Sequence, residues 1–219
     1  EAASSLPTPL QVTDLPIGAG PEEEVTPLSP VTPRVAVDES RLAALWEGGG
    51  ALERALPGFE HRPEQVTMAV AVAQAFNRGR HLLVEAGTGT GKSLAYLLPS
   101  VLYALGNQDR VVISTNTINL QEQLMGKDIP TVGRVLGPAG SGLRAATLKG
   151  RANYLCLRCW DAWRQRLVLS REEVRFLVRT LVWLSQTQTG DRAELHLVEK
   201  EPALWGQVSA EDASHLSRL

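Results

Sequence analysis

The chain has 219 residues, of which 43% are hydrophobic and 21% charged, and its formal net charge is −2. These values are typical of a soluble globular protein, and they lack the marked basic excess of many nucleic-acid-binding domains. Two cysteines are too few for a disulfide-stapled secreted scaffold. No signal peptide or bilayer-length apolar stretch is visible. We therefore expect a cytoplasmic protein that does not bind membranes.

Residues 1–40 differ in composition from the rest of the chain. They contain seven acidic residues, one basic residue and seven of the thirteen prolines, with few periodic apolar positions. Such a segment buries too little apolar surface to offset the entropy lost on ordering. We predict a disordered, Pro-rich acidic linker over 1–40, with ordered structure from residue 41 onward.

Residues 41–150 alternate between amphipathic helical patterns and short apolar runs. This alternation predicts an α/β domain in which helices flank a parallel sheet. Pro99 is expected to kink one helix, and Gly126 to end another. The expected elements are a helix over 62–77, a strand over 82–84, a helix over 91–105, a strand over 111–114 and a helix over 119–125.

A glycine-rich loop lies between the first expected strand and the helix that follows it. Glycines let backbone N–H groups converge on phosphate oxygens, and the helix N-terminus adds unpaired donors and partial positive charge. Lys92 is placed to reach the β- and γ-phosphates, and the Ser93 hydroxyl to bind Mg²⁺. The sequence therefore predicts a site for ATP and Mg²⁺. The loop consists of Ala86, Gly87, Thr88, Gly89, Thr90, Gly91, Lys92 and Ser93.

The pattern changes after Gly150. Ser170 and Glu173 have the spacing of a helix capping box, and apolar residues follow at helical spacing. Residues 187–219 carry a weaker signal, which indicates helical or irregular structure. We predict a separate helical region over 151–219, with Trp160, Trp163 and Trp183 in its core rather than stacked on bases.

Four stretches resemble motifs of the DinG/XPD-like iron–sulphur DNA helicases of superfamily 2, and the bacterial DinG branch fits best. This resemblance implies a RecA-like first motor domain over 41–150, truncated, and the start of a helical iron–sulphur-type insertion over 151–219. It also implies ATP-driven 5′–3′ translocation on single-stranded DNA. The four stretches are Phe59–Met68, Glu85–Pro99, Val111–Leu124 and Leu148–Cys156.

The resemblance assigns roles to individual residues, each with an alternative. Arg62 and Gln65 would lie beside the adenine, or else in a solvated first helical turn. The single-stranded DNA backbone would contact Thr115, Asn116, Thr117 and Gln121; alternatively, residues 115–117 form only a strand-to-helix turn, with Asn116 as the N-cap.

Cys156 would be the first ligand of a [4Fe–4S] cluster in the intact protein. The alternatives are a buried thiol, or a zinc site shared with Cys159 at Cys-x-x-Cys spacing. The chain departs from the family pattern at His215, which stands about where the second cysteine ligand is expected.

No Asp-Glu-Ala-His box follows the loop, and the second motor domain of the family is missing. Because phosphoryl transfer needs these parts, we expect the chain to be an N-terminal fragment of a helicase and to be inactive alone. Two other hypotheses remain: a stand-alone P-loop module that binds nucleotide without turnover, and another P-loop enzyme such as a small kinase. The sequence does not indicate an oligomeric state.

Overall fold

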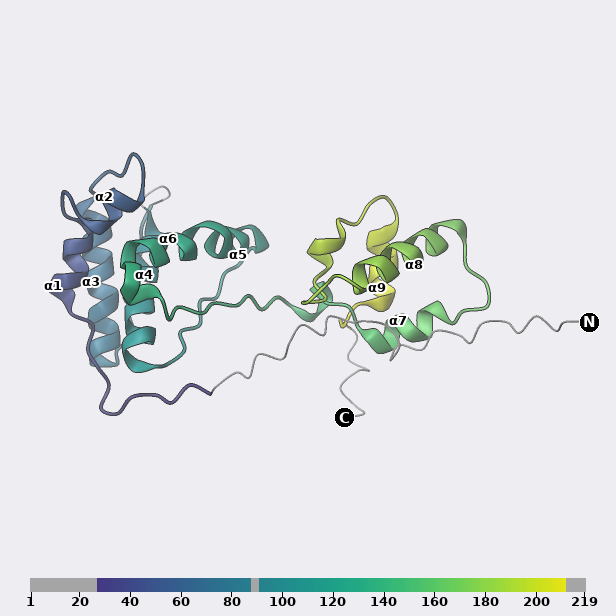
Figure 1. Cartoon of the computed structure of the whole chain (residues 1–219), viewed down its shortest axis with the longest axis horizontal. Helices are drawn as coiled ribbons and strands as arrows, with labels where there is room; N and C mark the ends of the chain where they lie inside the picture. Colours follow the sequence, from purple (N-terminus) through teal and green to yellow (C-terminus); the bar gives the residue numbers. More distant parts are fainter. Residues whose placement is uncertain (1–26, 88–90, 212–219) are drawn as a thin grey trace, which may run out of the picture. The chain divides into compact units, whose positions relative to one another are not determined.

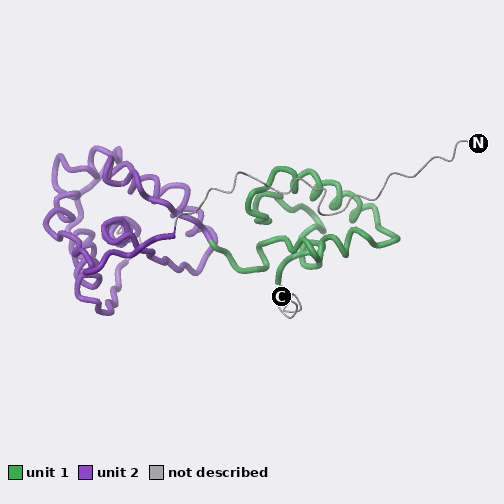
Figure 2. Tube along the Cα trace, turned by 60° about the horizontal axis from the view of Figure 1, so that its bottom comes forward, with its two compact units in different colours: residues 1–25, 148–219 green, residues 26–147 purple. Residues whose placement is uncertain are grey.

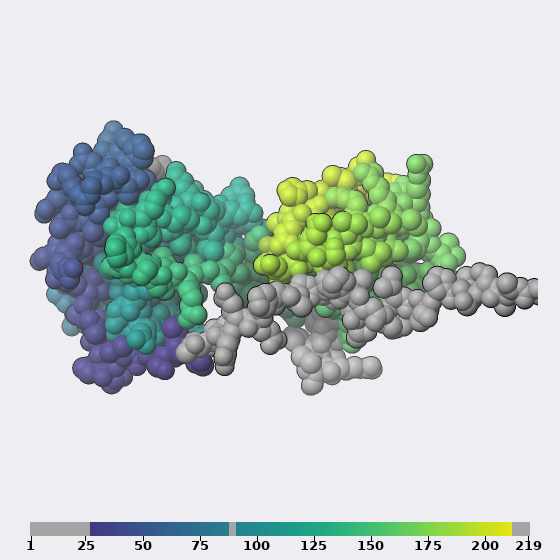
Figure 3. Space-filling view, viewed as in Figure 1, coloured from purple at the N-terminus to yellow at the C-terminus, as the bar shows by residue number. Residues whose placement is uncertain are grey.

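In the computed structural model, residues 27–87 and 91–211 are described. They form two compact units, an N-terminal unit within Thr26–Thr147 and a C-terminal unit within Leu148–Leu219 (Figures 1 and 2). In the space-filling view of Figure 3, the N-terminal unit runs from purple to teal and the C-terminal unit from green to yellow. Within these residues, no helix combines the length and the apolar character that crossing a membrane requires.

Two helices, α3 (Pro63–Arg78) and α4 (Lys92–Asn107), pack against each other in the N-terminal unit (Figure 1). Near their C-terminal ends, the rings of Phe76 and Tyr103 stack with centroids 4.6 Å apart. The expected kinking proline, Pro99, lies inside α4, which continues through it.

Shorter helices surround this pair and bury one apolar core with it. Leu42, Trp46, Ala73, Leu98 and Val132 are fully buried members of that core. The surrounding elements are α1 (Glu39–Ala43), a 3₁₀ turn over Ala44–Trp46, α2 (Ala51–Ala55), α5 (Ile118–Gln123) and α6 (Ile129–Leu136).

Residues 31–37 form a strap along the C-terminal ends of α3 and α4. The side-chain amide of Asn107 accepts a bond from Val35 N at 2.7 Å and donates to Val35 O at 2.9 Å. Asn77 makes the same pair of bonds with Val37, at 2.7 and 2.9 Å. The prediction of disorder through residue 40 is therefore wrong for the strap, because the buried Asn107 amide and the partly buried Asn77 amide supply hydrogen-bond partners for its backbone. Residues 1–26 lie outside the described residues.

The two predicted strands are not paired within the described residues. Residues 82–84 and 111–114 are neither helical nor part of a ladder there, and Leu83 and Val112 are 98% and 89% exposed. A parallel strand is stabilised by ladder hydrogen bonds and by burial of both faces. Neither is provided by the described residues, so the predicted sheet is not observed.

The predicted end of a helix at Gly126 is also wrong. After α5, a π-helical turn over Leu124–Asp128 leads directly into α6. Glycine weakens a helix but does not forbid it. Burial of Leu124 and of Asp128, whose carboxylate accepts a bond from Gln123 Nε2 at 3.1 Å, holds the turn.

The C-terminal unit is helical around a core of aromatic side chains. The predicted capping box is confirmed: the Ser170 hydroxyl accepts from Glu173 N, and the Glu173 carboxylate accepts from Ser170 N. The tryptophans expected in the core are buried, together with Phe176 and Trp205. Two isolated antiparallel bridges, Tyr154 with Asp191 and Leu155 with Ser209, are present. The helices are α7 (Leu157–Arg164), α8 (Arg171–Leu184) and α9 (Glu201–Val208).

Candidate nucleotide site

The predicted phosphate loop leads into the N-terminus of α4. Gly91 is the N-cap of this helix, with φ 71° and ψ 30°, a left-handed conformation that glycine adopts readily. A Cβ at Gly91 would lie 2.0 Å from Nε2 of Gln65. The left-handed backbone therefore favours glycine here, and any side chain at this position would force the Gln65 amide to shift. Thr88, Gly89 and Thr90 lie outside the described residues.

Lys92, the first residue of α4, turns its side chain back onto the loop. Its Nζ donates to the carbonyl oxygen of Ala86 at 2.9 Å and to that of Gly87 at 2.5 Å. The ammonium group thus lies at the mouth of the loop, where it is placed to meet an anion held by the loop amides.

Ser93 follows Lys92 in the first turn of α4 and hydrogen-bonds with the phenol of Tyr96. Burial raises the pKa of that phenol above its ordinary value of 10.0. The hydrogen bond with Ser93 opposes this shift, and the nearby Asp128 carboxylate adds to it. The Ser93 hydroxyl thus lies one residue from Lys92 in the first turn of α4, where it bonds with Tyr96.

Arg62 and Gln65 lie at the N-terminus of α3, as predicted. Arg62 is the N-cap, and its guanidinium pairs with the Glu60 carboxylate at 3.0 Å. Gln65 is not solvated: it is only 8% exposed, and its Oε1 accepts a bond from the indole Nε1 of Trp46 at 3.0 Å. The alternative of a solvated first turn therefore fails for Gln65.

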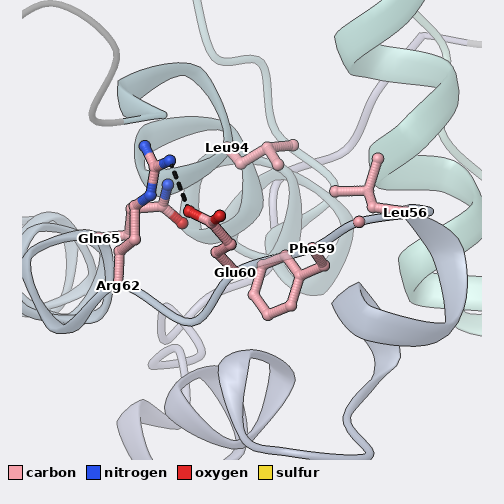
Figure 4. A pocket seen from close by; sticks show the side chains of 7 residues that line it. Leu56, Phe59, Glu60, Arg62, Gln65 and Leu94 are labelled. Atoms are coloured by element: carbon pink, nitrogen blue, oxygen red, sulfur yellow. Dashed lines mark hydrogen bonds and ion pairs between the residues drawn. The ribbon is translucent and has the colours of Figure 1, made fainter.

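A pocket of about 270 Å³ opens beside these residues (Figure 4). Leu56, Phe59 and Leu94 give it apolar walls, while Arg62, Gln65 and Glu60 bring polar groups to it (Figure 4). Leu94 comes from α4, two residues after Lys92, so the pocket and the loop share one helix. Apolar walls with a few convergent polar groups are typical of small-molecule sites.

The residues predicted to bind single-stranded DNA lie together at the start of α5. Thr117 is the N-cap and its hydroxyl accepts from Leu120 N at 3.3 Å, so Asn116 is not the cap as proposed above. The Thr115 hydroxyl donates to the Thr117 carbonyl at 3.1 Å. The side chains of Asn116 and Thr117 are exposed and that of Gln121 is partly buried. This leaves a polar surface at a helix N-terminus.

Cys156 occupies the N-cap of α7, where its Sγ accepts from Cys159 N at 3.4 Å. Both thiols are partly buried and neither forms a disulfide. Among the described residues, no group of three or more His, Cys, Asp or Glu side chains is arranged to hold a metal ion. His215 lies outside the described residues. Taken alone, the described part of the chain therefore does not complete a four-ligand cluster site.

Most residues around the pocket had no predicted role, since only Arg62 and Gln65 were assigned one. Leu56 and Leu94 line the pocket, and Trp46 bonds to Gln65. Leu94 directly follows the phosphate loop in the sequence, and this position alone could have indicated that it lies beside the site. No feature of the sequence pointed to Trp46, because its contact with Gln65 depends on how α1 and the following turn pack on α3.

Comparison with known proteins gives one family match and several similar sequences. Residues 67–137 match the family described as DEAD/DEAH box helicase. The chain is 42% identical over 164 residues to the ATP-dependent DNA helicase YoaA of Escherichia coli, covering 74% of this chain and 24% of that protein. It is 41% identical over 170 residues to the ATP-dependent helicase DinG of Mycobacterium tuberculosis, covering 71% of this chain and 25% of that protein.

A third similar sequence is the 3′-5′ exonuclease DinG of Bacillus subtilis, 38% identical over 172 residues, which cover 78% of this chain and 18% of that protein. The chain thus spans between 18% and 25% of the length of these three relatives. No solved structure matches the chain.

Proposed function

We propose that this chain, which belongs to the DEAD/DEAH box helicases and is related to DinG and YoaA, binds ATP with Mg²⁺ as part of an ATP-dependent DNA helicase. One observation carries the proposal. The pocket and the phosphate loop meet where α3 and α4 both begin, so one ligand with a flat ring and a polyphosphate can reach both.

In this proposal the adenine ring enters the pocket between Phe59 and Leu94. Apolar walls favour the faces of a flat ring, and Arg62 and Gln65 offer hydrogen-bond donors at its edge. The walls and these two polar groups support the adenine role carried over from the family.

The phosphates lie on the loop from Ala86 to Gly91, with Lys92 as their charged partner. The Lys92 ammonium already bonds to two loop carbonyls, and a phosphate is a stronger partner for it than a neutral carbonyl. We assign Mg²⁺ binding to the Ser93 hydroxyl, on the next residue of α4. The cation supplies charge neutralisation between the phosphates.

We further propose that residues 82–84 and 111–114 are strands of a RecA-like parallel sheet in the whole protein. Leu83 and Val112 are almost fully exposed in the described residues, while Val111 and Ile113 are partly buried. Both segments lead directly to proposed functional positions. Further strands would bury Leu83 and Val112 and give the backbone its hydrogen-bond partners.

Single-stranded DNA is the proposed partner of Thr115, Asn116, Thr117 and Gln121. Short polar side chains at a helix N-terminus suit phosphate oxygens, since the free amides and the helix dipole add to the side-chain donors. Movement along DNA in the 5′–3′ direction, driven by ATP hydrolysis, is proposed for the whole protein on the basis of the family resemblance.

Cys156 is proposed as one ligand of a [4Fe–4S] cluster in the whole protein. Its Sγ already accepts a hydrogen bond from the backbone N of Cys159, and hydrogen bonds to the ligand sulfurs are among the features that tune such clusters. The remaining ligands must come from outside the described residues. No step of the proposed ATP chemistry passes through the cluster.

Equilibrium binding of ATP with Mg²⁺ to the whole chain tests the proposal, with Lys92→Ala as the variant. Loss of a charge-assisted contact, worth on the order of 1.5–3 kcal/mol, weakens affinity by roughly ten- to 150-fold. Lys127→Ala removes an exposed lysine from the π-helical turn and serves as the matched control. Equal affinity of Lys92→Ala and Lys127→Ala for ATP would reject the assignment.

A further inference from the structure

We infer that Trp46 is a positioning residue that sets which end of the Gln65 amide faces the nucleotide site. The inference rests on the proposed function, since it concerns ATP binding in the same pocket. It adds a residue that lies outside the phosphate loop and does not line the pocket.

The contact between the two side chains is buried. Trp46, in the 3₁₀ turn after α1, is 0% exposed, and its Nε1 lies 3.0 Å from Oε1 of Gln65. The indole is packed within the core of the N-terminal unit, so it does not move to follow Gln65. Its N–H therefore acts as a fixed donor on the core side of the amide.

The chemistry of the indole decides the orientation of the amide. An indole N–H only donates, so the amide atom facing Trp46 must be the oxygen. A carboxamide is planar, and fixing its oxygen directs its nitrogen the other way. The distances agree: a Cβ built on Gly91 lies 2.0 Å from Nε2, 2.9 Å from Cδ and 3.6 Å from Oε1. The donor end of Gln65 thus faces the turn that leads from the phosphate loop into α4.

This orientation matters for an anionic ligand. An amide N–H₂ group at the loop attracts phosphate oxygens and ring nitrogens, whereas a carbonyl oxygen there repels them. Without the indole N–H, both orientations of the amide become accessible and only one of them favours the ligand. Trp46 therefore raises ATP affinity without touching ATP.

The test measures ATP affinity in Trp46→Phe, which removes the N–H and retains an aromatic ring. We expect affinity to fall about two- to tenfold, because equal population of both amide orientations halves the competent fraction and a preference for the reversed orientation lowers it further. In a Gln65→Met background, which has no amide to orient, Trp46→Phe should change affinity by less than about twofold. Gln65→Glu keeps an oxygen for Trp46 but places a carboxylate oxygen at Gly91, so it should weaken ATP binding more than Trp46→Phe does.

Stability needs its own control, because Trp46→Phe also leaves a space in the core. Val132→Ala removes a fully buried side chain of α6 that does not line the pocket, and it should lower the melting temperature without changing ATP affinity. Two results would overturn the inference about Trp46 and leave the proposed function standing. One is an equal loss of ATP affinity in Val132→Ala, and the other is an equal effect of Trp46→Phe with and without Gln65. If the unsubstituted chain binds no ATP, the proposed function fails and the inference fails with it.

Discussion

Gly91 is the residue at which the two halves of the candidate site meet. Its left-handed backbone turns the chain into α4, and its missing side chain lets the Gln65 amide approach. An L-residue in this conformation costs roughly 1–2 kcal/mol, before any clash is counted. A single position thus controls both the start of the phosphate-loop helix and the space for the amide.

Gly91→Ala should therefore lower both the melting temperature and the ATP affinity. The added methyl group clashes with Gln65 Nε2 and strains the backbone, so we expect a loss of about 1–3 kcal/mol of unfolding free energy. Gly106→Ala, in the same helix and with open space around the position, is the control and should be neutral or slightly stabilising. A stable Gly91→Ala with unchanged ATP affinity would show that the contact with Gln65 is unimportant.

The positions of Lys92 and Ser93 at the start of a helix could be predicted because the signal is local, while their roles in binding ATP and Mg²⁺ stay predictions. Lys92 and Ser93 follow directly from the loop pattern, and the structure has both in the first turn of α4. The bond between Trp46 and Gln65 joins residues that are 19 positions apart. No local pattern encodes such a contact, because it is created only when the helices pack.

At the scale of elements, the sequence predicts amphipathic helices well, but it does not predict which strands pair. The helix expected over 62–77 is observed as α3, because its apolar positions and Pro63 are local features. Strands 82–84 and 111–114 depend on neighbours that hydrogen-bond to them. The strap was missed for a similar reason, since its order comes from Asn77 and Asn107 on distant helices.

Asn107→Ala should release the strap and destabilise the N-terminal unit. The Asn107 side chain is fully buried and makes two bonds to Val35. Their loss should reduce the free energy of unfolding by about 1–3 kcal/mol. Chemical denaturation measures this, with the exposed Asn116→Ala as the control. Equal stability of the two variants would mean that the strap does not contribute to folding.

Glu194 gives the C-terminal unit a dependence on pH. Burial acts to raise the pKa of its carboxyl, but hydrogen bonds from Thr187, Thr189 and Trp183 outweigh this and hold it below its ordinary value of 4.5. A lowered pKa in the folded state stabilises the fold above pH 4.5, and this stabilisation is lost as pH falls through the folded value.

Denaturation followed by tryptophan fluorescence should therefore show lower stability below the pKa of Glu194 than at neutral pH, and Glu194→Gln should reduce that difference. The indole Nε1 of Trp183 donates to Glu194 at 2.9 Å, so this tryptophan contributes to the change in fluorescence together with the other four of the chain. An identical pH profile in Glu194→Gln would assign the dependence to other groups.

At the scale of the whole molecule, the chain divides into two units between residues 147 and 148. The change of sequence pattern after Gly150 indicated a division close to this point. Arg144 is exposed in the segment before the division, whereas Lys149 pairs with Asp191 at 2.6 Å and its side chain is 8% exposed. Arg144 and Lys149 are therefore held very differently, although they lie only five positions apart.

Limited digestion with trypsin should cut after Arg144 well before it cuts after Lys149. Proteases need an accessible, locally flexible backbone, and the ion pair with Asp191 protects Lys149. Mass spectrometry of the early fragments identifies the sites. Lys149→Ala provides a check, since it removes the later site and should leave the early pattern unchanged. Early cleavage at Lys149 instead would mean that the C-terminal unit opens at its first residues.

The central claim is that the pocket beside α3 and α4 holds the adenine ring of ATP while the loop before α4 holds its phosphates. Photo-crosslinking with an azido-adenine analogue of ATP, followed by peptide mass spectrometry, tests this most directly. We predict that the label falls between Leu56 and Arg62, that excess ATP suppresses it, and that Lys92→Ala weakens it. Labelling confined to the C-terminal unit, or labelling that excess ATP does not reduce, would contradict the account.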